Sequence, residues 1–154
     1  MTTPYGKIRK DLIPSEEAEQ RALAQWLDLH KILWCHVPNG GQRSKAVAGK
    51  LKAAGVKAGV PDVLVFDRPR ACPPSDCSIG HTMIVQPNDH DCPLHARGVA
   101  IELKRAKPAA SRLSDEQEAW LHNLASAGWI TRVCYGASEA IALLESLGFG
   151  RART

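Results

Sequence analysis

The chain has 154 residues, of which 44% are hydrophobic and 23% are charged, and its formal net charge is +4. This length fits one domain with a sizeable core, so we expect a single domain over 14–148 behind a polar, basic arm at 1–13. The sequence shows neither a signal peptide nor an apolar run of membrane-spanning length, and we expect a cytoplasmic protein without membrane contacts.

The first helix is expected to begin after Ser15, which is a suitable N-cap and is followed by acidic residues. Its apolar face repeats at helical spacing, at Leu23, Trp26 and Leu27. Glu16, Glu19 and Gln20 fall on or beside this face. An acid there either caps the helix or belongs to a site, and the pattern leaves both readings open.

A short apolar strand is expected over 32–37, followed by a turn that is rich in glycine. In this turn, Asn39, Gly40 and Arg43 suit a phosphate, because small residues expose backbone amides and arginine binds phosphate through two nitrogens. An ordinary turn has the same composition. A basic, alanine-rich helix is expected next, over 44–54.

Two further strands, near 59–66 and 98–104, carry charged residues within apolar runs. Asp62 follows a Gly-Val-Pro turn at the start of the first of these strands. In the second, Glu102 and Lys104 alternate with apolar residues, so both charged side chains lie on one face. A solvated strand edge shows the same local pattern, but the apolar neighbours indicate a central strand, where unpaired charges are costly. Together these groups suit a divalent cation beside a phosphate.

Residues 68–97 separate these two strands and read as an insertion in a hairpin, with a short strand expected near 82–85. Five cysteines, an odd number, favour free or metal-bound thiols over disulfides in a reducing compartment. Cys72 and Cys77, with Cys92 and His95, offer four ligands for a structural zinc ion. The alternative is a long loop whose thiols stay reduced.

The last part of the chain predicts a helix that begins after Ser114, a strand over 130–135 and a closing helix over 137–147. Gln117 stands at the capping-box position and also on the helix face that carries Trp120 and Leu121. It therefore either caps the helix or faces inward. Helices and strands alternate along the whole chain, which predicts an α/β fold with a mixed central sheet flanked by helices.

Basic residues gather in two segments. The first holds Arg43, Lys45, Lys50, Lys52 and Lys57, and the second holds Lys104, Arg105, Lys107 and Arg112. Such clusters suit a polyanion such as DNA, although a solvated surface has the same composition.

The order of these motifs resembles that of the VRR-NUC (virus-type replication-repair nuclease) family of the PD-(D/E)xK nuclease superfamily. The motifs are an acidic first helix, Asn-Gly-Gly-x-Arg, a basic helix, Gly-Val-Pro-Asp, Ile-Glu-Leu-Lys and Leu-Ser-x-x-Gln, and they extend from Glu16 to Leu147. The resemblance implies a restriction-endonuclease-like core and a DNA endonuclease that depends on Mg²⁺ or Mn²⁺. It further implies a homodimer acting on branched DNA, such as four-way junctions or flaps, in phage or bacterial replication, recombination or repair.

The resemblance also implies roles for individual residues. It makes Asp62 and Glu102 metal ligands with the Leu103 carbonyl as a third, Lys104 the catalytic lysine, Gln117 the active-site glutamine and Glu16 the acid of the first helix, with Glu19 as the alternative. The residues expected to contact DNA are Gln20, Asn39, Gly40, Arg43, Lys45, Lys57 and Arg105.

Three alternatives remain open from the sequence. A restriction-type endonuclease of the same fold would cut at defined sequences, a DNA-binding module would use the basic residues without catalysis, and a zinc-dependent regulator would use the Cys/His insertion. The insertion at 68–97 also departs from the compact members of the family, so their substrate preference does not transfer directly.

Overall fold

The computed structural model describes residues 13–38, 45–70, 96–107 and 111–150. Within them lie eight elements: α1 (Glu16–Leu29), β1 (Trp34–His36), α2 (Lys45–Ala53), β2 (Val63–Val65), β3 (Val99–Lys104), α3 (Asp115–Ser126), β4 (Ile130–Tyr135) and α4 (Ala137–Ser146). The predicted alternation of helices and strands is confirmed. The strand expected near 82–85 and the four candidate zinc ligands lie outside the described residues.

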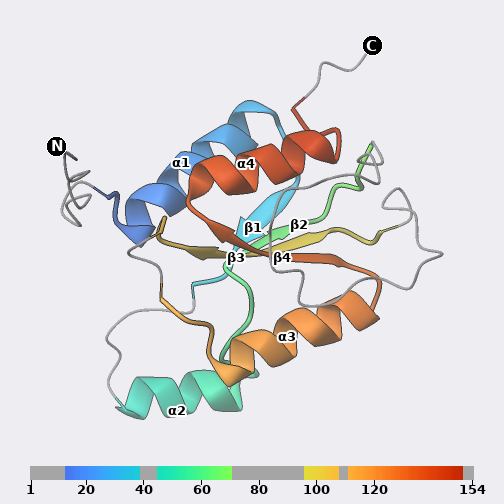
Figure 1. Cartoon of the computed structure of the whole chain (residues 1–154). Coiled ribbons are helices and arrows are strands. Elements are labelled where there is room, and N and C mark those ends of the chain that lie inside the picture. The colour runs from blue at the N-terminus through green and yellow to red at the C-terminus, as the bar shows by residue number, and fades with distance from the viewer. Residues whose placement is uncertain (1–12, 39–44, 71–95, 108–110, 151–154) are drawn as a thin grey trace, which may run out of the picture.

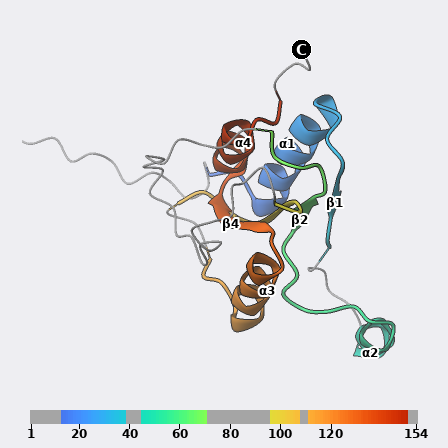
Figure 2. The ribbon, with the colours of Figure 1, turned by 90° about the vertical axis from the view of Figure 1, so that its right-hand side faces the viewer.

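The strands form one mixed sheet in the order β1-β2-β3-β4. β1 pairs with β2 and β2 with β3 in antiparallel fashion, whereas β4 runs parallel to β3. α1 and α4 cover one face of this sheet and α3 covers the other, while α2 stands apart from both layers (Figures 1 and 2). The insertion therefore does interrupt an antiparallel hairpin, since it lies between β2 and β3.

The main hydrophobic core fills the space between the sheet and the α1/α4 layer. Its fully buried members include Leu23 and Leu27 of α1, Leu144 of α4, and Val99 and Ile101 of β3. Because successive side chains of a strand point to opposite faces, the alternate residues of β3 point toward α3. The charged residues of β3 thus lie on the face that a single helix covers.

Local capping fixes where the helices begin. The Ser15 hydroxyl accepts a hydrogen bond from the Ala18 amide over 3.1 Å, which confirms Ser15 as the N-cap of α1. α4 begins after Gly136, which has no side chain to cap the helix; instead, the Glu19 carboxylate of α1 accepts from the Ala137 amide over 2.8 Å. An acid of one helix therefore caps another, which also joins α1 to α4.

Several strand and helix bounds differ from those expected. β1 spans only Trp34–His36. β2 spans only Val63–Val65, because Gly59 before it has a φ of +78° and Pro61 has no amide to donate to a ladder. α2 spans Lys45–Ala53, close to the expected 44–54. None of the helices in the described ranges combines the length and apolar character needed to cross a membrane.

Candidate active site

The predicted acid of β2 and the predicted acid and lysine of β3 lie close together in the structure. β3 is one of the two central strands, and both Glu102 and Lys104 are almost fully buried, with exposed fractions of 1% and 5%. The Lys104 Nζ lies 2.9 Å from the Glu102 Oε1. Asp62 precedes β2 directly and its Oδ2 accepts from the Leu103 amide over 3.0 Å. Strand pairing therefore brings together residues that are 40 positions apart in the sequence.

Gln117 of α3 completes this cluster, and it is both the helix cap and an inward-facing residue. Its Oε1 accepts from the Ser114 amide over 3.0 Å and lies 3.2 Å from the Lys104 Nζ. Its Nε2 donates to Glu102 Oε1. The two readings that the sequence left open thus both hold: the capping box of Ser114 and Gln117 is present, and the same amide contacts the buried ion pair.

The surroundings of Asp62 and Glu102 disfavour the charged form of both carboxyl groups. Burial, and next the negative charge of Asp62, raise the pKa of Glu102 to about 7, although the hydrogen bond and charge of Lys104 act in the opposite direction. Burial also raises the pKa of Asp62, and the Leu103 amide and the Lys104 charge only partly offset it. Two neighbouring acids with raised pKa values in a partly enclosed site are typical of a functional site.

The same acids fit a divalent cation. Glu102 Oε2 is buried and has no hydrogen-bond partner among the described residues, and a cation would satisfy it together with the Asp62 charge. Nowhere in the described ranges do three His, Cys, Asp or Glu side chains gather as a ligand set. Two carboxylates nevertheless suffice for Mg²⁺, which usually takes one or two of them and completes its shell with water, carbonyl and phosphate oxygens.

The structure distinguishes between Glu16 and Glu19, the two candidate acids of α1. Glu19 is occupied at the start of α4, as described above. Glu16 is exposed and its charge contributes to raising the pKa of Glu102, so it lies near the site. Gln20, one turn further, is half-buried, and its Nε2 has no hydrogen-bond partner among the described residues. Glu16 is therefore the better placed of the two acids.

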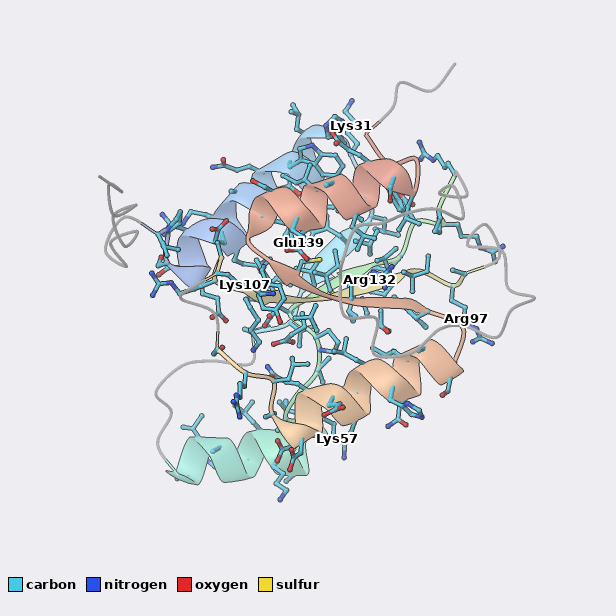
Figure 3. All side chains as sticks on the ribbon, viewed as in Figure 1. Lys31, Lys57, Arg97, Lys107, Arg132 and Glu139 are labelled. Atoms are coloured by element: carbon cyan, nitrogen blue, oxygen red, sulfur yellow. The ribbon has the colours of Figure 1, made fainter. Side chains whose placement is uncertain are left out.

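Only some of the residues that were expected to contact DNA lie in the described ranges. Asn39, Gly40 and Arg43 lie outside the described residues, and α2 begins at Lys45. The Arg105 guanidinium donates to the carbonyls of Pro14 and Ile13, over 3.0 and 2.8 Å, and so holds the chain before α1. Lys57 is exposed on the α3 side of the molecule (Figure 3).

His36 is a site neighbour that the sequence reasoning missed. Its Nδ1 lies 2.9 Å from the Asp62 carbonyl, and its charge lowers the pKa of the Asp62 carboxyl. His36 is the last residue of β1 and pairs with Val63, which directly follows Asp62, so the sheet brings His36 next to Asp62. Only the register of β1 against β2 reveals this proximity, and the sequence gives no direct signal for that register.

A central strand that presents Glu-x-Lys beside the acid of a neighbouring strand defines a PD-(D/E)xK-like α/β core. The VRR-NUC domain model matches residues 14–138. A solved structure described as a VRR_NUC domain protein matches with a TM-score of 0.58 and 21% sequence identity, over 86% of this chain and 87% of that chain. No curated protein matches the sequence. The chain belongs to the VRR-NUC domain family, which is a family of nucleases.

Proposed function

We propose that the protein is a Mg²⁺- or Mn²⁺-dependent DNA endonuclease that hydrolyses phosphodiester bonds at the site formed by Asp62, Glu102 and Lys104. One observation carries this proposal: a buried lysine is paired with a carboxylate whose second oxygen has no hydrogen-bond partner among the described residues, and another acid lies beside it. A purely structural ion pair in a core would be expected to satisfy its remaining oxygen.

Asp62 and Glu102 would hold the cation, with the Leu103 carbonyl as a third protein ligand. A bound divalent cation would supply Lewis acidity beside the scissile phosphate. Burial and, next, the charge of Asp62 raise the pKa of Glu102, and a cation bound to both carboxylates would offset their negative charge. Glu16, exposed near the site, would hold water molecules of the cation's shell.

Lys104 would act on the reacting groups. Its Nζ carries three donors, and the described contacts direct one to Glu102 and one to Gln117, over 2.9 and 3.2 Å. The remaining donor is suited to orienting the attacking water or stabilising the charge that develops on the phosphate. Gln117 would position Lys104 by accepting from it. Gln20 would offer its Nε2, which has no hydrogen-bond partner in the part of the chain that the structure describes, to a phosphate or water.

The DNA would be bound mainly through its phosphates. Lys45 and Lys57 lie at either end of the segment that carries α2, and the loop at 39–43 would add backbone amides and Arg43. Such contacts give affinity without reading the sequence. We therefore propose structure-selective cleavage of branched DNA by a homodimer, with a role in replication, recombination or repair.

A panel of end-labelled substrates tests this proposal. Four-way junction, flap and plain duplex of shared sequence would be incubated with the protein in Mn²⁺, Mg²⁺ or EDTA. We expect cleavage only with the metal and faster cleavage of the branched substrates. Equal rates on all substrates would refute structure selectivity, products at one defined sequence would indicate a restriction-type enzyme, and binding without cleavage would indicate a binding module.

A further inference from the structure

The loop between α2 and β2 contacts the first turn of α3 at Gly59. A Cβ atom at Gly59 would lie 2.5 Å from the backbone carbonyl carbon of Glu116, 2.7 Å from its Cβ and 2.8 Å from the Gln117 amide nitrogen. Real Cβ atoms essentially never approach other heavy atoms so closely. Two of these three atoms belong to the backbone of the helix, so a side-chain rotation cannot relieve the contact.

The helix turn that Gly59 contacts is the turn that carries Gln117. The Ser114 hydroxyl accepts from the Gln117 amide over 3.3 Å, and the Ser114 amide donates to the Gln117 side chain over 3.0 Å. These two bonds leave the Gln117 carboxamide directed at Lys104 and Glu102. The turn is thus fixed from outside by the Gly59 contact and from within by the capping box.

We propose that Gly59 and Ser114 are positioning residues for the nuclease site: they place the Gln117 carboxamide within hydrogen-bond distance of Lys104 and Glu102. The inference rests on the proposed function and deepens it. Gly59 stands three residues before Asp62, so one short segment places both an acid of the site and the helix turn that bears its amide. A glycine at position 59 thus allows both the turn before β2 and the close approach of α3.

Alanine variants at three glycines separate this role from ordinary backbone strain. Gly55, Gly59 and Gly128 have φ angles of +96°, +78° and +86°, so alanine is strained at each. A Cβ at Gly55 meets nothing within 4 Å, and one at Gly128 meets nothing closer than 3.8 Å. Gly55→Ala and Gly128→Ala are therefore controls for strain, one in the same loop and one at the other end of α3.

Single-turnover cleavage and DNA affinity would be measured for each variant. We expect Gly59→Ala to lower the cleavage rate about 100-fold, the effect of a displacement of about 1 Å, with DNA affinity within roughly twofold of wild type. The two controls should cleave at the wild-type rate. If Gly59→Ala cleaves as fast as Gly55→Ala, the inference is wrong.

A second readout does not depend on activity. The side-chain amide resonances of Gln117, assigned by their loss in Gln117→Glu, should shift in Gly59→Ala and keep their positions in both controls. If wild-type protein cleaves nothing with the metal, the proposed function fails, while these resonances still decide the positioning role. Unchanged resonances in Gly59→Ala would overturn it.

Should Gly59→Ala not fold, the capping box allows the same test. Ser114→Ala removes the hydroxyl that accepts from the Gln117 amide, whereas Ser114→Thr keeps a capping hydroxyl. We expect slower cleavage and shifted Gln117 resonances in Ser114→Ala, and recovery of both in Ser114→Thr. Equal behaviour of the two variants would contradict the inference.

Discussion

Replacing Glu102 with glutamine should make the metal-free protein more stable at pH 8 while removing its nuclease activity. The side chain keeps its size and position but loses the charge that burial and the nearby Asp62 oppose. Lys104 loses its ionic partner, but the pKa of Glu102 is raised even with Lys104 beside it. The uncharged form is therefore favoured in the metal-free site.

The magnitude follows from the pKa. The carboxyl titrates near 4.5 in the unfolded chain and at about 7 in the folded protein. Between these values the folded state holds a proton that the unfolded state has released, so the free energy of unfolding falls as the pH rises. The full difference, reached above pH 7, corresponds to roughly 3 kcal/mol. The raised pKa of Asp62 acts in the same direction.

Denaturant unfolding in EDTA at pH 5 and pH 8 measures this effect. Wild-type protein should be less stable at pH 8 than at pH 5, and Glu102→Gln should lose most of that difference. Glu118→Gln, on the exposed face of α3, is the matched control and should behave as wild type. Added Mg²⁺ or Mn²⁺ should stabilise wild type at pH 8 more than Glu102→Gln. If Glu102→Gln is less stable than wild type at pH 8, the electrostatic reasoning is wrong.

Three further predictions concern other residues. Lys104→Met should lower single-turnover cleavage by roughly 10²- to 10⁴-fold and leave DNA affinity nearly unchanged, and retained cleavage would exclude Lys104 from catalysis. Glu19→Ala should lower the free energy of unfolding by about 2 kcal/mol, because α4 loses its cap. Glu17→Ala, on the exposed side of α1, is the control and should have a smaller effect, so equal stabilities of the two variants would refute the capping role. Cys134, buried with a pKa raised to about 12 by burial, should resist alkylation in the folded protein, whereas the exposed Cys35 should react; simultaneous labelling of both thiols would contradict this assignment.

The sequence predicted those features that depend on neighbours along the chain. The alternation around Glu102 and Lys104 correctly indicated a central strand with both charges on one face. Ser15 and Ser114 are the N-caps that the local patterns predicted. The strand over 130–135 was also predicted with its observed bounds, because β-branched residues lie between two glycine-containing turns.

Features that depend on the packing of distant segments were not predicted. Glu19 was an alternative to Glu16 for the site, and only the approach of α4 to α1 shows that Glu19 caps the other helix. The proximity of His36 to Asp62 depends on strand register. The contacts of the Arg105 guanidinium with the segment before α1 were not predicted either, and a DNA contact of Arg105 stays a prediction. Each of these depends on a contact between residues far apart in sequence. Secondary-structure propensities and the spacing of apolar residues carry no information about such contacts.

Cleavage of a labelled four-way junction by wild type and Glu102→Gln, purified in parallel, tests whether Glu102 belongs to a metal-dependent nuclease site. Each protein would be incubated in Mn²⁺ and in EDTA, and DNA binding would be measured on the same samples. We expect both proteins to bind the junction, and we expect only wild type to cut it, and only with Mn²⁺. Cutting by Glu102→Gln at the wild-type rate, or binding without any cutting by wild type, would contradict this expectation.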